Sequence, residues 1–88
     1  MQTSGLSREE AILIFKELMI ELKRLPSDSI YLVPPKETDD FSTGYQIHLP
    51  KSTSYTDRET LYKVANSHKL SVKELNDKII IFFQKHRN

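Results

Sequence analysis

The clearest hydrophobic pattern in the chain lies between residues 7 and 25. Apolar side chains recur there every three or four residues, so most of them fall on one stripe of a helix: Ala11, Ile14, Phe15, Leu18, Leu22 and Leu25. The segment begins with Ser-Arg-Glu-Glu at residues 7–10, which is the pattern of a capping box. Pro26 disfavours helical geometry at the residue before it. The sequence therefore predicts a helix that ends at Leu25 or one residue earlier.

Two short segments have the pattern of β-strands. Residues 29–33 are rich in strand-forming residues and are followed by two prolines, which lack backbone donors. Residues 45–49 alternate between apolar and polar side chains, as in a strand with one buried face. The intervening residues 36–44 are polar and acidic and end in Gly44, which is free to take a positive φ. We expect the two strands to pair antiparallel across this long loop.

The second half of the chain contains two further capping-box patterns, at residues 56–59 and 71–74. Apolar residues at helical spacing follow the first box and predict a second helix of about three turns. After the second box, residues 72–85 fit a third helix with one apolar face. Residues 79–83 are also β-branched and aromatic, which is typical of a buried strand. The two interpretations disagree about Ile81, because the helix would expose it and the strand would bury it.

Together these elements predict one α+β domain over residues 1–88, built in two layers. We expect the order α-β-β-α-α, with a two-stranded antiparallel hairpin covered by helices. The alternative is α-β-β-α-α-β, in which residues 79–83 form a third strand. A chain of 88 residues supports one hydrophobic core, and its content of 38% hydrophobic and 28% charged residues is typical of a globular domain. The sequence shows no internal repeat.

The composition narrows the environment in which the protein works. The chain has no cysteine, which excludes a disulfide framework and a thiolate metal site and favours a reducing compartment. Its longest apolar runs, residues 11–15 and 79–83, are far shorter than the roughly 20 residues needed to cross a bilayer. Residues 1–6 are too polar for a signal peptide. We therefore expect a cytoplasmic protein without a membrane partner.

The motifs of common enzymes and cofactor sites are missing from the sequence. Two glycines are too few for a Gly-rich phosphate loop, and there is no nucleophile elbow. The acidic pair Asp39 and Asp40 fits a solvated loop better than an acid–base pair. The histidines fall on separate predicted elements, unlike the close pairs typical of zinc sites: His48, His68 and His86. We expect no enzymatic activity, no cofactor and no metal site.

Residues 61–75 carry a resemblance to known families. They read Leu-Tyr-Lys-Val-Ala at 61–65 and Leu-Ser-Val-Lys-Glu-Leu at 70–75. This spacing resembles the helix pair of LysM domains, helix-turn-helix DNA-binding proteins and the N-terminal module of bacterial translation initiation factor two; we assign the chain to none of them. The resemblance implies a helix-turn-helix-like unit at residues 57–86 that binds nucleic acid. Its phosphate contacts would be Lys63, Lys69, Lys73 and Lys78.

One feature of the first predicted helix does not belong to the core. Leu13 and Ile20 are seven residues apart and lie opposite the apolar stripe, among charged side chains. An apolar pair on a charged face indicates a contact with another protein. Our leading hypothesis is a non-enzymatic protein-interaction or regulatory module that binds a protein partner, or a second copy of itself, through this helix. The nucleic-acid-binding module is the alternative.

Overall fold

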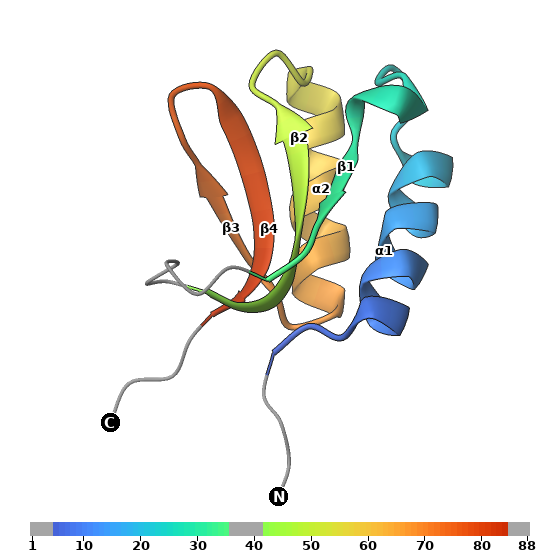
Figure 1. Cartoon of the computed structure of the whole chain (residues 1–88). Coiled ribbons are helices and arrows are strands. Elements are labelled where there is room, and N and C mark those ends of the chain that lie inside the picture. The colour runs from blue at the N-terminus through green and yellow to red at the C-terminus, as the bar shows by residue number, and fades with distance from the viewer. Residues whose placement is uncertain (1–4, 36–41, 85–88) are drawn as a thin grey trace, which may run out of the picture.

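The computed structural model describes residues 5–35 and 42–84 and shows an α+β fold in two layers (Figure 1). Both α-helices pack on one face of a four-stranded sheet, whose strand order is β1-β2-β4-β3 with every neighbouring pair antiparallel. The predicted class, with helices covering an antiparallel sheet, is confirmed. In chain order the elements are α1 (Arg8–Glu21), the 3₁₀ turn η1 (Ser27–Ser29), β1 (Tyr31–Val33), β2 (Ser42–Pro50), α2 (Tyr55–Ser67), β3 (Ser71–Glu74) and β4 (Lys78–Gln84).

The chain runs twice through the order helix, strand, strand. The hairpin β1–β2 and the hairpin β3–β4 each place one strand at an edge of the sheet and one at its centre, where β2 pairs with β4. Ile47 of β2 lies opposite Ile81 of β4 in this central pair. The sequence shows no matching repeat. The two halves also differ in the connection from helix to strand, which spans residues 22–30 in the first half and only 68–70 in the second.

The predicted third helix is wrong. Residues 79–83 form a strand, as the alternative order predicts, but that order also keeps a helix after α2, where the structure has the strand β3. After α2, Lys69 takes a positive φ of 61°, and the amide of Leu70 donates a 2.8 Å hydrogen bond to the carbonyl of Ala65. This is the Schellman arrangement that ends a helix, and the chain leaves it in extended form. Residues 71–74 therefore form β3 instead of a capping box. The helix-turn-helix-like unit expected at residues 57–86 is not formed.

Two side chains at the helix starts set where α1 and α2 begin. The amide of Glu10 donates to Oγ of Ser7 at 3.2 Å, as the first capping box predicts. In α2 the cap is Ser54, whose Oγ accepts from the amide of Asp57 at 3.2 Å, so this helix starts earlier than the box at residues 56–59 predicts. α1 also ends earlier than expected, at Glu21, because Leu22 is already extended and is buried in the core.

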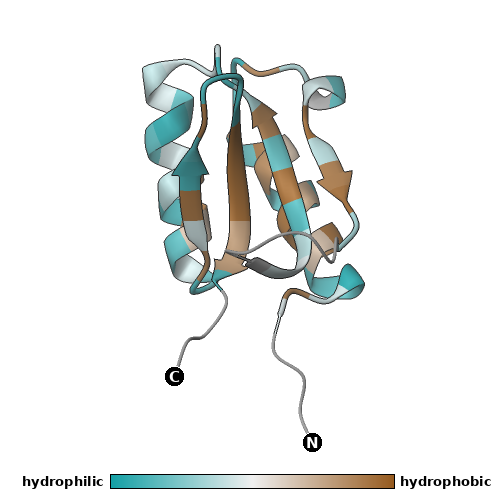
Figure 2. Ribbon diagram, turned by 60° about the vertical axis from the view of Figure 1, so that its left-hand side comes forward, coloured by the Kyte–Doolittle hydropathy of each residue, from teal (hydrophilic) through white to brown (hydrophobic). Residues whose placement is uncertain are grey.

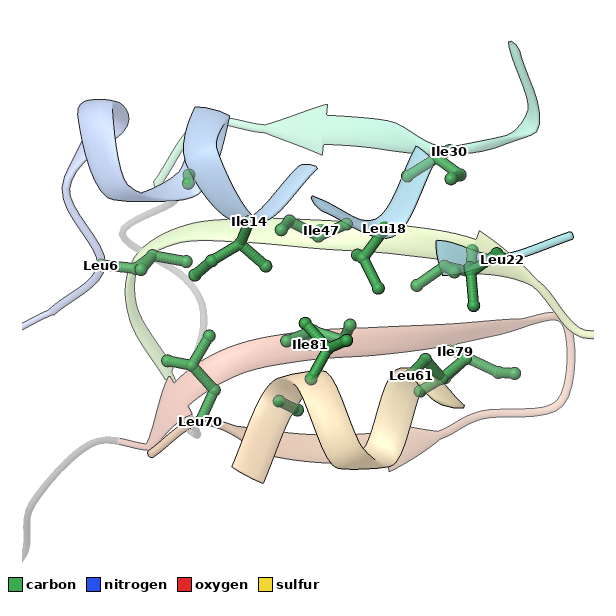
Figure 3. Packing of buried hydrophobic residues seen from close by; sticks show 14 residues of the cluster. Leu6, Ile14, Leu18, Leu22, Ile30, Ile47, Leu61, Leu70, Ile79 and Ile81 are labelled. Atoms are coloured by element: carbon green, nitrogen blue, oxygen red, sulfur yellow. The ribbon is translucent and has the colours of Figure 1, made fainter. Parts of the chain in front are cut away.

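The core lies between the sheet and the helix layer. Figure 3 shows Ile14 and Leu18 of α1 and Leu61 of α2 reaching toward Ile47 and Ile81 of the central strands. Polar and apolar residues alternate along β2, whereas β4 is hydrophobic along nearly its whole length (Figure 2). β4 is the strand that the sequence leaves between two interpretations, and its burial on both faces explains why it lacks the alternating pattern.

Candidate functional site

The outer face of α1 carries two large apolar side chains in contact with water. Leu13 is 66% exposed and Ile20 is 69% exposed, while Ile14 and Leu18 on the opposite face are buried. We call Leu13 and Ile20 the α1 pair. They lie two helical turns apart on one side of the helix, as the sequence predicts. Figure 1 shows α1 packed beside α2 on one face of the sheet, and the buried Ile14 and Leu18 mark the side of α1 that faces the core.

A hollow of about 240 Å³ opens beside Leu13, between the start of α1 and the end of α2. Its lining is mixed: the apolar part comes from Leu6, Leu13, Ile14, Leu70 and Phe83, and the polar part includes Glu10 and His68. We call this space the Leu13 hollow. An exposed apolar side chain beside a partly apolar depression is an arrangement in which interface anchors are found.

A hydrogen bond joins the two helices next to the same hollow. Nε2 of His68, just after α2, lies 2.9 Å from Oε1 of Glu17, one turn beyond Leu13 on α1. Both side chains are partly exposed, so the pair adds little to the free energy of unfolding. The contact with His68 holds the carboxylate of Glu17 toward α2, and so away from the surface between Leu13 and Ile20.

A second cluster of polar groups gathers around Glu74, at the end of β3. The hydroxyl of Tyr62 donates to Oε2 of Glu74 at 2.8 Å, and Nη1 of Arg58 donates to Oε1 at 2.9 Å. Nζ of Lys51 lies 3.4 Å from the same Oε1. The Tyr62 hydrogen bond, with the charges of Arg58 and Lys51, holds the pKa of Glu74 below its ordinary value. A carboxylate of this kind stays ionised near neutral pH and is a poor general acid.

Arg58 has a structural role in this cluster. Besides Glu74, its guanidinium donates to the backbone carbonyls of Lys51 and of Thr53, the latter at 3.0 Å. It therefore fastens the start of α2 to the loop after β2 and to the end of β3. Sequence reasoning missed the cluster because Arg58 and Glu74 are 16 residues apart and meet only when residues 71–74 form an edge strand.

Two tyrosines of α2 line a wider hollow, of about 480 Å³, next to the Glu74 cluster. Tyr55 is 75% exposed, and its hydrogen bond with Glu59 raises the pKa of its hydroxyl. Partial burial raises the pKa of the Tyr62 hydroxyl, and its bond to Glu74 raises it further. Both hydroxyls are therefore protonated at neutral pH, which does not favour their use as nucleophiles.

The four lysines of the nucleic-acid hypothesis do not gather on one surface. Lys63 lies on α2, and Lys69 lies in the turn that follows it. Lys73 stands opposite Ile80 in the register of β3 and β4, and Lys78 stands opposite Pro50 in that of β2 and β4. Because side chains alternate along a strand, both point to the face of the sheet that carries no helix. The lysines thus belong to opposite layers of the fold.

The groups considered for metal binding are also separate. Within residues 5–35 and 42–84, no three histidine or acidic side chains lie close enough together to hold a metal ion. His48 is on β2 and His68 follows α2. Asp39, Asp40 and His86 lie outside the described residues. In the same part of the chain, no helix has the length and apolar character needed to span a membrane.

No protein-family model, no curated protein and no solved structure significantly matches this chain. Among the described residues, exposed large side chains stand beside a hollow at Leu13 on α1 and at the two tyrosines of α2, whose hydroxyls are polar. The outer face of α1 differs in that its exposed pair, Leu13 and Ile20, is aliphatic.

Proposed function

We propose that this protein is a non-enzymatic interaction module that binds another protein chain through the outer face of α1. The observation that carries the proposal is the exposure of the α1 pair, with Leu13 66% and Ile20 69% accessible to water. Removing a Leu or Ile side chain from water contributes about 1.5–3 kcal/mol. Two such residues on one helical face therefore supply a useful part of a binding free energy.

The surroundings of the pair support this function over chance exposure. Single exposed apolar residues are ordinary on protein surfaces. Leu13 and Ile20, however, share one side of one helix, and Leu13 borders the Leu13 hollow. A partner side chain that enters the hollow would leave water at the same time as the α1 pair, and central anchors of this kind dominate binding energies.

The nucleic-acid-binding module remains the alternative, but it has less support than the protein-binding module. Its helix-turn-helix-like unit is replaced by β3 and β4, and its lysines lie on both layers of the fold. Phosphate contacts that act together need basic groups along one surface. The proposal for the outer face of α1 is not affected by the change from a predicted helix to strands at residues 71–84, because α1 is a helix in the structure and the α1 pair is exposed.

Site-specific photo-cross-linking tests the proposed function. A benzophenone amino acid replaces Leu13 or Ile20 in the full chain, in the cells that make the protein. We expect the probe at both positions to give the same covalent protein adduct. A probe at Tyr55, which is 75% exposed on α2, is the matched control and should not give it.

Substitutions give the second arm of this test. The adduct formed by the probe at Leu13 should disappear when Ile20→Lys is added and should persist with Tyr55→Lys. The proposal fails if neither position on α1 gives an adduct above the Tyr55 control, or if Ile20→Lys and Tyr55→Lys have the same effect.

A further inference from the structure

We infer that the chain bound by α1 is a second copy of this protein, with the two α1 helices packed antiparallel about a two-fold axis. The inference rests on the proposed function and names the partner for the same surface. Three properties of α1 carry it: the spacing of the α1 pair, the position of the Leu13 hollow, and the opposite charges at the two ends of the helix.

The spacing of the α1 pair suits an antiparallel contact. A two-fold axis between residues 16 and 17 places Leu13 of one copy opposite Ile20 of the other, and the same contact is repeated on the other side of the axis. The two residues are about 10.5 Å apart along the helix, so both contacts form with straight helices. In an isologous contact of this kind the same surface serves both copies.

The Leu13 hollow receives the side chain that this arrangement brings. Ile20 of the second copy lies against Leu13 and thus at the mouth of the hollow, whose lining includes Leu6 and Leu70. Each copy then contributes one projecting side chain and one depression.

The charges at the ends of α1 favour the same orientation. The first turn holds Glu9 and Glu10 after Arg8, and the basic pair Lys23 and Arg24 lies beyond the C-cap Leu22, past a last turn that ends in Glu21. The side chains of both pairs are exposed. An antiparallel partner brings its basic end beside the acidic end, and it also aligns the helix dipoles favourably. A parallel partner would instead bring the Glu9–Glu10 pairs of the two copies together, and likewise their Lys23–Arg24 pairs.

The centre of the contact limits its strength. Lys16 is exposed on the outer side of α1 and lies near the two-fold axis, so the two Lys16 side chains approach each other. One helix from each copy also buries a small area, in the class below about 1,200 Å² that is typical of weak complexes. The dimer should therefore form at high protein concentration and dissociate on dilution.

Cysteine cross-linking tests the arrangement, and the absence of native cysteine makes the result unambiguous. Leu13→Cys and Ile20→Cys are oxidised separately and as a mixture. In the antiparallel dimer, two copies of Cys at position 13 are about 10.5 Å apart, beyond the Cα separation of about 7 Å that a disulfide permits. We expect the mixture to form a disulfide-linked dimer at least about ten times faster than either variant alone.

Substitutions that introduce opposite charges test the same contact without a covalent bond. Leu13→Glu and Ile20→Lys should each abolish the concentration-dependent association of the full chain in sedimentation, measured from about 10 µM to about 1 mM. Mixing these two variants should restore a dimer, because the Glu of one meets the Lys of the other. Mixing Leu13→Glu with Leu13→Lys should not restore it. Circular dichroism of each variant confirms that α1 is still formed.

Two results would overturn the inference, and they can be told apart from a failure of the proposed function. Faster disulfide formation in either single variant than in the mixture would show a parallel contact. A wild-type monomer at every concentration, with no cross-linking, would show that no copy binds this face. In that second case, a photo-adduct from Leu13 and Ile20 to a different protein would keep the proposed function, and its absence would remove both.

Discussion

The carboxylate of Asp57 accepts a hydrogen bond from the backbone amide of Arg24, with a distance of 3.1 Å between Oδ2 and the amide nitrogen. Asp57 is in the first turn of α2, and Arg24 follows α1, so the bond ties the end of one helix to the start of the other. Only 2% of Asp57 is exposed. The positive end of the α2 dipole stabilises its negative charge in this buried position.

Replacing Asp57 should therefore destabilise the fold. Asp57→Ala removes the carboxylate acceptor of this partly buried hydrogen bond, which costs about 1–3 kcal/mol of the free energy of unfolding. Asp57→Asn keeps an acceptor oxygen and should cost less. Urea denaturation measures both, with the exposed Asp28 as the control: Asp28→Ala should stay within about 0.5 kcal/mol of the wild type. Equal losses at positions 57 and 28 would contradict the assigned role of this bond.

Replacing Lys69 with glycine should make the folded chain more stable. Its φ of 61° is in the left-handed region, which costs a residue with a Cβ about 1–2 kcal/mol and costs glycine almost nothing. Part of this gain is lost to the greater freedom of glycine in the unfolded chain, so Lys69→Gly should raise the free energy of unfolding by about 0.5–1 kcal/mol. Lys63→Gly, in the interior of α2, is the matched control and should lower it by about 1 kcal/mol.

The choice between strand and helix for the last segment can be tested at Ile81. Its side chain is 0% exposed at the centre of the core. Ile81→Lys should therefore cost more than about 4 kcal/mol or prevent folding, and the milder Ile81→Val about 0.5–1.5 kcal/mol. Leu13→Lys, on the exposed face of α1, should change the free energy of unfolding by about 0.5 kcal/mol or less. A tolerated Ile81→Lys would be the signature of a helix there.

The Glu74 cluster predicts a loss of stability in acid. The pKa of Glu74 is lower in the folded chain than its ordinary value of 4.5, chiefly because Tyr62 donates a hydrogen bond to the carboxylate. A carboxyl group whose pKa is lower in the folded state stabilises that state. This contribution is complete when the pH is above the ordinary pKa, and it is lost as the pH falls through the pKa of the folded state. Thermal unfolding from pH 7 to pH 3 should thus show a steeper acid loss in the wild type than in Glu74→Gln. Parallel curves would contradict it.

The sequence predicts the first half of the fold better than the second. The capping residue Ser7, the apolar stripe of α1 and the antiparallel partners β1 and β2 are all local patterns, and the structure confirms them. The misassignment at residues 71–84 arises because a Ser-x-x-Glu pattern fits a helix cap as well as a strand. The outcome is decided by distant contacts, since β4 pairs with β2 and is buried on both faces.

The candidate surfaces also divide into features that follow from local sequence and features that need distant contacts. The exposure of the α1 pair follows from the helical period and could be predicted from Leu13, Ile20 and their neighbours alone. The Leu13 hollow could not, because its lining joins residues of α1 with Leu70, which follows α2. The Glu74 cluster could not be predicted either, because it requires the edge strand β3 to lie beside α2. Local periodicity shows which side chains point outward, and the tertiary fold decides what stands next to them.

The pairing of β2 with β4 has a consequence for the protein during its synthesis. α1, β1 and β2 leave the ribosome first, and the backbone edge of β2 that pairs with β4 has no partner until β4 has been made. An unpaired strand edge with apolar side chains is a site of aggregation. The nascent chain therefore passes through a vulnerable interval that lasts from residue 50 to residue 84, and slow translation of α2 and β3 would lengthen it.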